Sequence, residues 1–302
     1  MPDGAPVIVA GIRISNPERV LYEEMGLTKA ALARYYESVA EWMLPEIRER
    51  PLSLVRCPQG PGEGCFYQKN IDEKFPAEIE RVPVELGGGG LYAAANSEAA
   101  VVGLVQMGVI ELHAWGSTTR KPECPDRMVF DLDPDARLPW REVMAAAHLV
   151  RERLEGLGLE SFVKTTGGKG LHVVVPLAPR HDWDEVKQFS RALAESIVAQ
   201  RPQDFTAKAA KRERSRRIFI DWLRNSEGAT AIAPYSARAR PGAPVATPLH
   251  WDEVGGRMKP TKYHVGNVAR RLRGLHSDPW KQLRRKPQAI TAAMKRKLDL
   301  TP

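Results

Sequence analysis

The chain has 302 residues, with 45 Lys and Arg against 37 Asp and Glu, which gives a net charge of +8 at pH 7. Hydrophobic residues make up 43% of it, which is enough for a sizeable core and excludes disordered, collagen-like and coiled-coil classes. No apolar run approaches the roughly 18 residues of a membrane span. Residues 1–11 also lack the pattern of a secretory signal, so we expect no membrane partner.

Three cysteines, Cys57, Cys65 and Cys124, do not make a disulfide framework. No Cys-x-x-Cys or His-x-x-x-His pair completes a zinc site, and no Gly-x-Ser-x-Gly elbow indicates a serine hydrolase. The cysteine usage therefore favours a cytoplasmic protein with reduced thiols.

The excess positive charge lies at the C-terminal end. Residues 257–302 hold 13 Lys and Arg but two acids, a net charge of +11, and residues 1–256 sum to −3. Such a segment favours a polyanionic partner such as DNA. A solubilising helical tail is the alternative.

The order of predicted elements indicates an α+β fold, with β-sheets flanked by helices, rather than a doubly wound parallel sheet. Thr28 and Ser97 are expected to cap the first two helices, and Pro45 limits the first of them. The basic C-terminal end mixes turns and helices. The predicted helices cover 29–44, 98–106, 141–157 and 183–200, and the clearest strands cover 128–133, 161–165, 171–176 and 217–221.

Two carboxylates, Asp131 and Asp133, end the predicted strand 128–133. Side chains at i and i+2 of a strand share a face, and unpaired carboxylates there raise each other's pKa. A divalent cation removes this repulsion by accepting both as hard oxygen ligands. Asp221 ends another apolar strand, so a sheet could gather three carboxylates around two metal ions about 4 Å apart, as in phosphoryl transfer. Solvated turns or caps are the alternative.

A glycine-rich turn over 164–172 joins two predicted strands. Its glycines let backbone N–H groups face an anion, and Thr166 and Lys169 add a hydroxyl and a charge. His172, at the start of the next strand, could donate to a triphosphate. The turn is not a P-loop, and a purely structural hairpin would look much the same.

Basic side chains elsewhere extend this phosphate-binding interpretation. Arg224 follows Asp221, and Arg238 lies in a Tyr-Ser-x-Arg segment; guanidinium groups suit bidentate phosphate binding. A solvated basic face is the alternative. His113 ends a predicted strand, where it either reaches the same cleft or forms a buried pair with Trp115.

Four motifs in order resemble one known family: Asp-x-Asp, Thr-Gly-Gly-Lys-Gly-Leu-His, Phe-Ile-Asp-Trp and Tyr-Ser-x-Arg. The chain resembles the archaeo-eukaryotic primase superfamily and, within it, the polymerase domain of bacterial ATP-dependent DNA ligase D, from Asn16 to about Trp280. The resemblance implies an RRM-like primase-polymerase core in a single domain, 1–302, of a larger ligase. The implied parts are a 5′-phosphate-binding part (about 1–125), a catalytic core (about 126–250) and a basic C-terminal part (about 251–302).

The resemblance also implies a role for each candidate residue. The catalytic metal ligands are Asp131, Asp133 and Asp221; the nucleotide is bound by Thr166, Lys169, His172, Arg238, His113 and Arg224; the 5′-phosphate of the downstream DNA strand is bound by Asn16, Arg19 and Lys29; and either Phe66 or Tyr67 stacks on a templating base.

The implied activity is that of a template-dependent polymerase, a DNA-directed nucleotidyltransferase. It would add deoxyribonucleotides, or preferably ribonucleotides, to 3′-OH ends and fill gaps during bacterial non-homologous end joining, with two Mn²⁺ or Mg²⁺ ions. The implied partners are DNA ends, gapped or primer-template duplexes, ligase and phosphoesterase domains of the same polypeptide, and the Ku end-binding protein, in the cytoplasm at the nucleoid. A metal-dependent nuclease and a non-catalytic DNA-end-binding module remain as alternatives.

Overall fold

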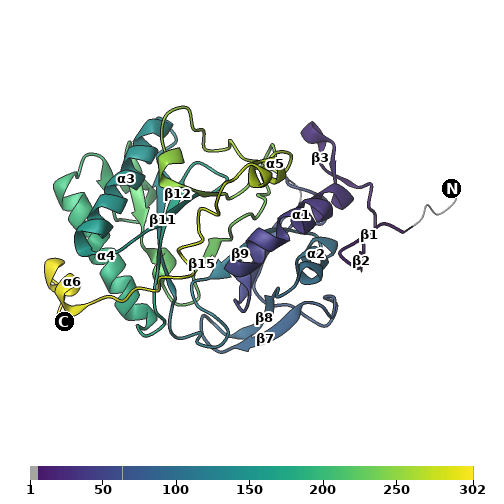
Figure 1. Cartoon of the computed structure of the whole chain (residues 1–302), viewed down its shortest axis with the longest axis horizontal. Helices are drawn as coiled ribbons and strands as arrows, with labels where there is room; N and C mark the ends of the chain where they lie inside the picture. The colour runs from purple at the N-terminus through teal and green to yellow at the C-terminus, as the bar shows by residue number, and fades with distance from the viewer. Residues whose placement is uncertain (1–5, 63, 302) are drawn as a thin grey trace. The chain divides into compact units, whose positions relative to one another are not determined.

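The computed structural model describes residues 6–62 and 64–301, whose backbone divides into two compact units (Figure 1). The first unit comprises the described residues up to Trp115, together with 232–246 and 263–275. The second comprises 116–231, 247–262 and the described residues from His276 onward. Both units combine helices with sheets, which confirms the predicted α+β class.

The first unit is built on a sheet with the strand order β15-β9-β5-β8-β7, in which β6 pairs with β5. Helix α1 packs on α2, and α2 packs on β9. The Thr28 hydroxyl accepts the N–H of Ala31, and the Ser97 hydroxyl accepts that of Ala100, so both predicted caps are confirmed. The sheet strands are β5 (Leu52–Arg56), β6 (Phe66–Gln68), β7 (Glu80–Val84), β8 (Gly90–Ala94), β9 (Val109–Trp115) and β15 (Thr230–Ile232).

Helices and two small strand pairs complete the first unit. Strand β1 pairs with β2, and β3 pairs with β4, both antiparallel. These elements are α1 (Lys29–Ile47), α2 (Glu98–Gln106), α5 (Val268–Arg273), β1 (Ile8–Val9), β2 (Ile12–Arg13), β3 (Val20–Tyr22), β4 (Leu27–Thr28) and the 3₁₀ turn η1 (Glu23–Met25).

Pro45 lies inside α1, which continues to Ile47, so the expectation that the helix stops before this proline is wrong. A proline removes one intrahelical hydrogen bond and crowds the preceding turn. Here the proline sits in the last turn, and the N–H of Arg48 bonds to the carbonyl of Leu44 at the helix end. The loss of this hydrogen bond is therefore confined to the last turn of the helix.

The second unit is built on a six-stranded sheet in the order β13-β14-β10-β12-β11-β16. Its pairs are antiparallel except for β13 and β14. Helix α3 packs on β12 and β10, and α4 packs on β10 and β13. Each predicted helix and strand of this unit is present within one residue of its predicted ends. These are α3 (Trp140–Leu157), α4 (Trp183–Gln200), β10 (Arg127–Pro134), β11 (Phe162–Thr165), β12 (Leu171–Pro176) and β14 (Ile218–Asp221).

Short elements complete the second unit. The basic C-terminal end contributes α5 to the first unit and α6 to the second, so it is not one continuous helix. In the second unit, Lys295 pairs with Glu185 and Lys286 with Glu160. The remaining elements are α6 (Ala292–Lys297), β13 (Phe205–Thr206), β16 (Pro248–Leu249), and the 3₁₀ turns η2 (Lys211–Arg214), η3 (Leu223–Asn225) and η4 (Trp251–Glu253).

One face of the second unit's sheet changes character along the strands. Residues directly opposed in an antiparallel pair point to the same side, and Val174 opposes both Val129 and Phe162. These three pack with Trp280 in one buried cluster. Asp131, two residues beyond Val129, therefore emerges on the same face. The apolar end of the face anchors the sheet, and the polar end carries the acids.

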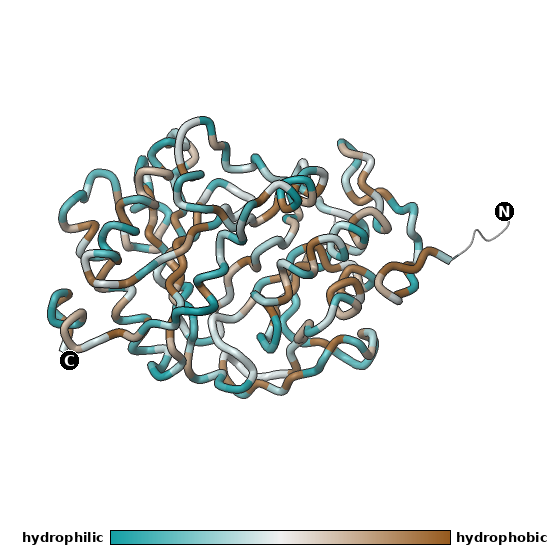
Figure 2. Tube along the Cα trace, viewed as in Figure 1, coloured by the Kyte–Doolittle hydropathy of each residue, from teal (hydrophilic) through white to brown (hydrophobic). Residues whose placement is uncertain are grey.

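Hydrophobic residues follow the secondary structure (Figure 2). The tube shows them gathered along α1, α2 and the strands β11 and β12, with hydrophilic residues on many connecting segments. Among the helices of the described residues, none combines the length and the apolar character needed to cross a membrane.

Cys57 and Cys65 form a disulfide, with Cα atoms 4.3 Å apart, so the expectation of reduced thiols is wrong for this pair. The cause is the β5–β6 hairpin, in which Arg56 opposes Phe66. Cys57 follows β5 and Cys65 precedes β6, so this register brings the two cysteines opposite each other. Spacing alone does not indicate such a register. Cys124 is the free cysteine of the described residues.

The disulfide closes a loop between residues separated by eight positions in the sequence. A cross-link of this size stabilises a fold by roughly 2–3 kcal/mol, because it restricts the unfolded chain. We expect a double Cys57→Ser, Cys65→Ser variant to lose about that much free energy of unfolding in urea titrations, and Cys124→Ser to lose little. A wild-type protein equally stable with and without reductant would contradict this.

Candidate active site

Three polar side chains form a row across the second unit's sheet. In the registers of β10, Asp131 directly opposes Asp221 on β14 and His172 on β12. The three side chains therefore point to one side of three adjacent strands. Asp133 lies two residues further along β10 and shares that face. The sheet thus brings together the two strand ends that the sequence predicted.

Arg224, from η3, bridges two of these carboxylates. Its Nε lies 3.2 Å from Asp131 Oδ2 and 3.3 Å from Asp221 Oδ2, and its Nη2 lies 3.2 Å from Asp131 Oδ2. The other oxygen of Asp131 faces His172 Nε2 at 3.4 Å. The single guanidinium of Arg224 therefore offsets the repulsion between the two neighbouring carboxylates.

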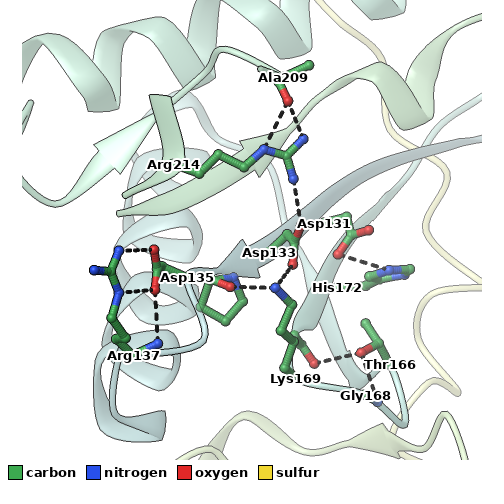
Figure 3. Close-up of polar contacts among 12 residues, drawn as sticks. Asp131, Asp133, Asp135, Arg137, Thr166, Gly168, Lys169, His172, Ala209 and Arg214 are labelled. Atoms are coloured by element: carbon green, nitrogen blue, oxygen red, sulfur yellow. Dashed lines mark hydrogen bonds and ion pairs between the residues drawn. The ribbon is translucent and has the colours of Figure 1, made fainter. Parts of the chain in front are cut away.

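Asp133 is held by two cations that approach from different segments (Figure 3). Lys169 Nζ lies 2.9 Å from Oδ1, and Arg214 Nη1 lies 2.7 Å from Oδ2. Arg214 also stacks on the ring of Phe219, 4.1 Å from its centroid, and donates to the carbonyl of Ala209. Asp133 is thus neutralised on both of its oxygens.

The pKa values of this row reflect burial opposed by charge. Burial acts to raise the pKa of Asp131, but His172, Arg224 and Lys164 outweigh it and hold that pKa well below the usual value. Burial raises the pKa of Asp221, and the charge of Asp131 adds to the effect. Burial, followed by the charge of Lys164, lowers the pKa of His172 to about 4, so its imidazole is neutral at pH 7.

The donor chemistry of the three acids fits a hard divalent cation such as Mg²⁺ or Mn²⁺. In the described part of the chain, no group of three or more His, Cys, Asp or Glu side chains is already gathered as a metal cage. Basic side chains balance the acids instead. A cation held by Asp131, Asp133 and Asp221 would therefore replace contacts that Arg224, Lys169 and Arg214 now make.

The glycine-rich turn lies against the end of β10. The hydroxyl of Thr166 accepts the N–H of Gly168 and donates to the carbonyl of Gly170. A Cβ at Gly170 would lie 2.4 Å from the carbonyl oxygen of Leu132, closer than real contacts allow. The buried Nδ1 of His172, which follows the turn, has no hydrogen-bond partner among the described residues. An unsatisfied polar atom of this kind is suited to a ligand.

The Gly170→Ala substitution should displace the turn, because the new methyl group collides with β10. Overpacking of this kind typically costs about 1–3 kcal/mol. Gly156→Ala, at a helical position with nothing near its added Cβ, serves as the control and should be neutral or slightly stabilising. Urea unfolding measures both. A Gly170→Ala protein as stable as the control would show that the turn does not lie against this strand.

The first unit holds His113 and Arg238 around a third residue, Glu111. His113 Nε2 lies 2.8 Å from Glu111 Oε2, and Arg238 Nε lies 3.0 Å from Glu111 Oε1. The Trp115 ring, two residues further along β9, packs edge to face on Tyr92. His113 and Arg238 are thus brought together within the first unit, and the acidic row lies in the second.

Asn16, Arg19 and Lys29 line one cavity of about 240 Å³ in the first unit. Lys29 is buried and its Nζ donates to the carbonyl and the side-chain oxygen of Gln106, at 2.9 and 3.0 Å. Burial, aided by the charge of Arg19, lowers the pKa of Lys29 to about 8. Arg19 Nη1 donates to the carbonyl of Pro58. The cavity is therefore a cationic pocket whose charge depends on pH.

Phe66 and Tyr67 project from β6 with 45% and 49% of their surfaces exposed. The ring of Tyr67 meets the His113 ring edge to face at 5.8 Å, and the Arg56 guanidinium lies over Phe66 at 5.4 Å. Both aromatic side chains are available for stacking.

The sequence did not indicate Glu111 or Gln106 as members of these clusters. It also did not indicate that Arg214 forms an ion pair with Asp133. Glu111 had a usable signal, because it is an acid in the middle of the apolar strand Val109–Trp115. Gln106 ends a helix and carries no such signal.

An α+β sheet that carries acids on one face, beside a glycine-rich turn with basic side chains, is an arrangement that suits a polymerase-type nucleotidyltransferase. The family model for the LigD primase-polymerase domain matches residues 28–280. The chain belongs to the LigD primase-polymerase domain family.

Individual relatives agree with this assignment. The multifunctional non-homologous end joining protein LigD of Pseudomonas aeruginosa is 41% identical over 291 residues, 96% of this chain and 35% of that protein. Its namesake in Mycolicibacterium smegmatis is 34% identical over 80% of this chain and 32% of its own length. The chain thus spans about a third of each of these relatives. The solved polymerase domain of Mycobacterium tuberculosis ligase D, in complex with DNA, matches with a TM-score of 0.84 and 28% identity, over 91% of this chain and 99% of that one.

Proposed function

We propose that this chain extends DNA 3′-OH ends on a template, with ribonucleotides preferred over deoxyribonucleotides, and fills gaps during bacterial non-homologous end joining. The observation that carries the proposal is the register of β10, which aligns Asp131 with Asp221 and His172 next to the glycine-rich turn. Acids that can hold cations and a turn that can hold phosphates are the two parts that nucleotidyl transfer requires.

In the proposed reaction, the primer 3′ oxygen bonds to the α-phosphorus of the nucleotide, and the bond to pyrophosphate breaks. Asp131, Asp133 and Asp221 would hold Mn²⁺ or Mg²⁺, which supplies charge stabilisation at the transferred phosphoryl group. Lys169 and Arg224 would bind phosphate oxygens once a cation holds the aspartates that they now contact. The Thr166 hydroxyl and the buried His172 ring would orient the nucleotide.

The first unit would supply the remaining DNA and nucleotide contacts. Arg19 and Lys29, with Asn16, form a cationic cavity of a size suited to a terminal phosphate, so we assign it to the 5′-phosphate of the downstream strand. His113 and Arg238 would bind the nucleotide. One of the exposed rings of β6 would stack on a templating base.

The relatives' part in non-homologous end joining supports a proposal for the wider setting. We propose that the chain works beside ligase and phosphoesterase domains of one polypeptide, on DNA ends presented by Ku, in the bacterial cytoplasm. We also propose that the basic residues of 257–302 add salt-dependent affinity for DNA that is independent of sequence. The segmentation into parts of about 1–125, 126–250 and 251–302 stays a prediction.

Removal of one acid should abolish extension without loss of DNA binding. We expect Asp131→Asn and Asp133→Asn each to lower nucleotide incorporation on a gapped duplex by roughly 100-fold or more, since each removes a carboxylate that would hold the cation at the transferred phosphate. Asp135→Asn is the matched control, because Asp135 is bound by Arg137 outside the acidic row. Extension assays and DNA anisotropy measure the two properties. Wild-type extension by Asp133→Asn would refute the assignment.

Recognition of the 5′-phosphate should weaken with rising pH. The pKa of Lys29 is lowered to about 8, so its ammonium is charged below that pH and neutral above it. The preference for a gap with a 5′-phosphate over one with a 5′-hydroxyl should therefore fall between pH 7 and pH 9. Lys29→Arg, which stays charged, should flatten this dependence.

The double variant Arg19→Ala, Lys29→Ala should show no preference at any pH. Competition binding with the two gapped duplexes measures it. Discrimination that persists in the double variant would place the phosphate pocket elsewhere.

A further inference from the structure

We propose that Glu111 is a positioning residue that holds His113 and Arg238 as one cationic pair for the nucleotide. This inference rests on the proposed function, which assigns nucleotide binding to His113 and Arg238. Glu111 itself would not touch the nucleotide.

The geometry gives one carboxylate three nitrogen partners from two segments. Oε2 faces His113 Nε2 at 2.8 Å, and Oε1 lies 3.0 Å from Arg238 Nε and accepts the N–H of Ala239 at 2.8 Å. His113 and Glu111 lie two residues apart on β9, on the same face. Arg238 and Ala239 belong to the loop that follows Tyr235. The carboxylate therefore ties this loop to the strand.

Further contacts hold the loop around the pair. The Tyr22 hydroxyl donates to the carbonyl of Arg238, and the Arg238 N–H bonds to the carbonyl of Pro244. With the backbone held at these points, the ion pair between the Glu111 carboxylate and Nε keeps the guanidinium beside Glu111. A guanidinium that is fixed in this way loses less conformational freedom when it binds a phosphate.

Exposure separates the carboxylate from its two partners. The side chain of Glu111 is 7% exposed, and those of His113 and Arg238 are 16% and 14% exposed. A ligand would therefore meet the imidazole and the guanidinium before the carboxylate. Burial acts to raise the pKa of Glu111, but His113, Arg238 and the Ala239 N–H lower it to about 2, so the group stays ionised at neutral pH.

The ionised carboxylate has a second consequence, for the charge of His113. A carboxylate within hydrogen-bonding distance stabilises the imidazolium form. His113 contacts Glu111 on its own strand and the ring of Tyr67 from β6, and Arg238 from the loop lies on the other oxygen of the same carboxylate. Removal of the Glu111 charge leaves the guanidinium, which disfavours the imidazolium.

The test compares Glu111→Gln with wild type in the full chain. We expect the apparent KM for the nucleotide to rise about 10-fold or more, with a smaller change in kcat, because a charged contact that orients the binding pair is lost. In the protein without nucleotide, the pKa of His113 measured by NMR should fall, because the carboxylate that favours its imidazolium form is gone. Glu37→Gln is the control, since Glu37 accepts a backbone N–H from Ala10 elsewhere in the same unit.

Glu111→Asp keeps the charge on a shorter side chain and separates charge from mere packing. We expect it to retain the His113 pKa and to raise KM less than Glu111→Gln does. Equal effects of the two variants, or a Glu111→Gln protein with wild-type KM and wild-type His113 titration, would overturn the inference. If wild type itself extends no primer, the proposed function fails, and the NMR titration still decides whether Glu111 controls His113.

Discussion

The second unit depends on one constraint, the register of β10 between β12 and β14. Because Asp131 opposes both Asp221 and His172, two acids and an imidazole must share one face at the centre of a sheet. A shift by one residue would send the Asp131 side chain to the opposite face of the sheet. The apolar cluster of Val129, Val174 and Trp280 on the same face resists such a shift.

This crowding of acids requires compensation, and the chain supplies it with side chains of its own. Arg224 bridges Asp131 and Asp221, and Lys169 and Arg214 hold Asp133. Those basic groups are suited to a second use, since guanidinium and ammonium groups that neutralise carboxylates also bind phosphates. We propose that a cation binds the carboxylates and a triphosphate binds the basic side chains, so that the two ligands together replace these ion pairs.

The sequence predicted the acidic residues of this site better than the side chains that pair with them. The pattern of Asp131 and Asp133 on one strand, and of Asp221 at the end of another, follows from the period of a β-strand. The partner of each acid depends on pairing register and loop placement, which local sequence does not encode. Arg214 on Asp133, the Cys57–Cys65 disulfide and the three contacts of Glu111 are all of this kind. The sequence also did not predict that α1 continues past Pro45, because the effect of a proline depends on its distance from the helix end.

The central claim is that the acidic row and the glycine-rich turn together perform template-directed nucleotidyl transfer. The most direct measurement offers wild-type protein a gapped duplex with a labelled primer, Mn²⁺ and each of the four nucleotides separately. We expect the primer to grow when the nucleotide complements the template base. A primer that shortens without any nucleotide would indicate a nuclease, and a primer that is bound but unchanged would indicate an end-binding module; either result would contradict the account.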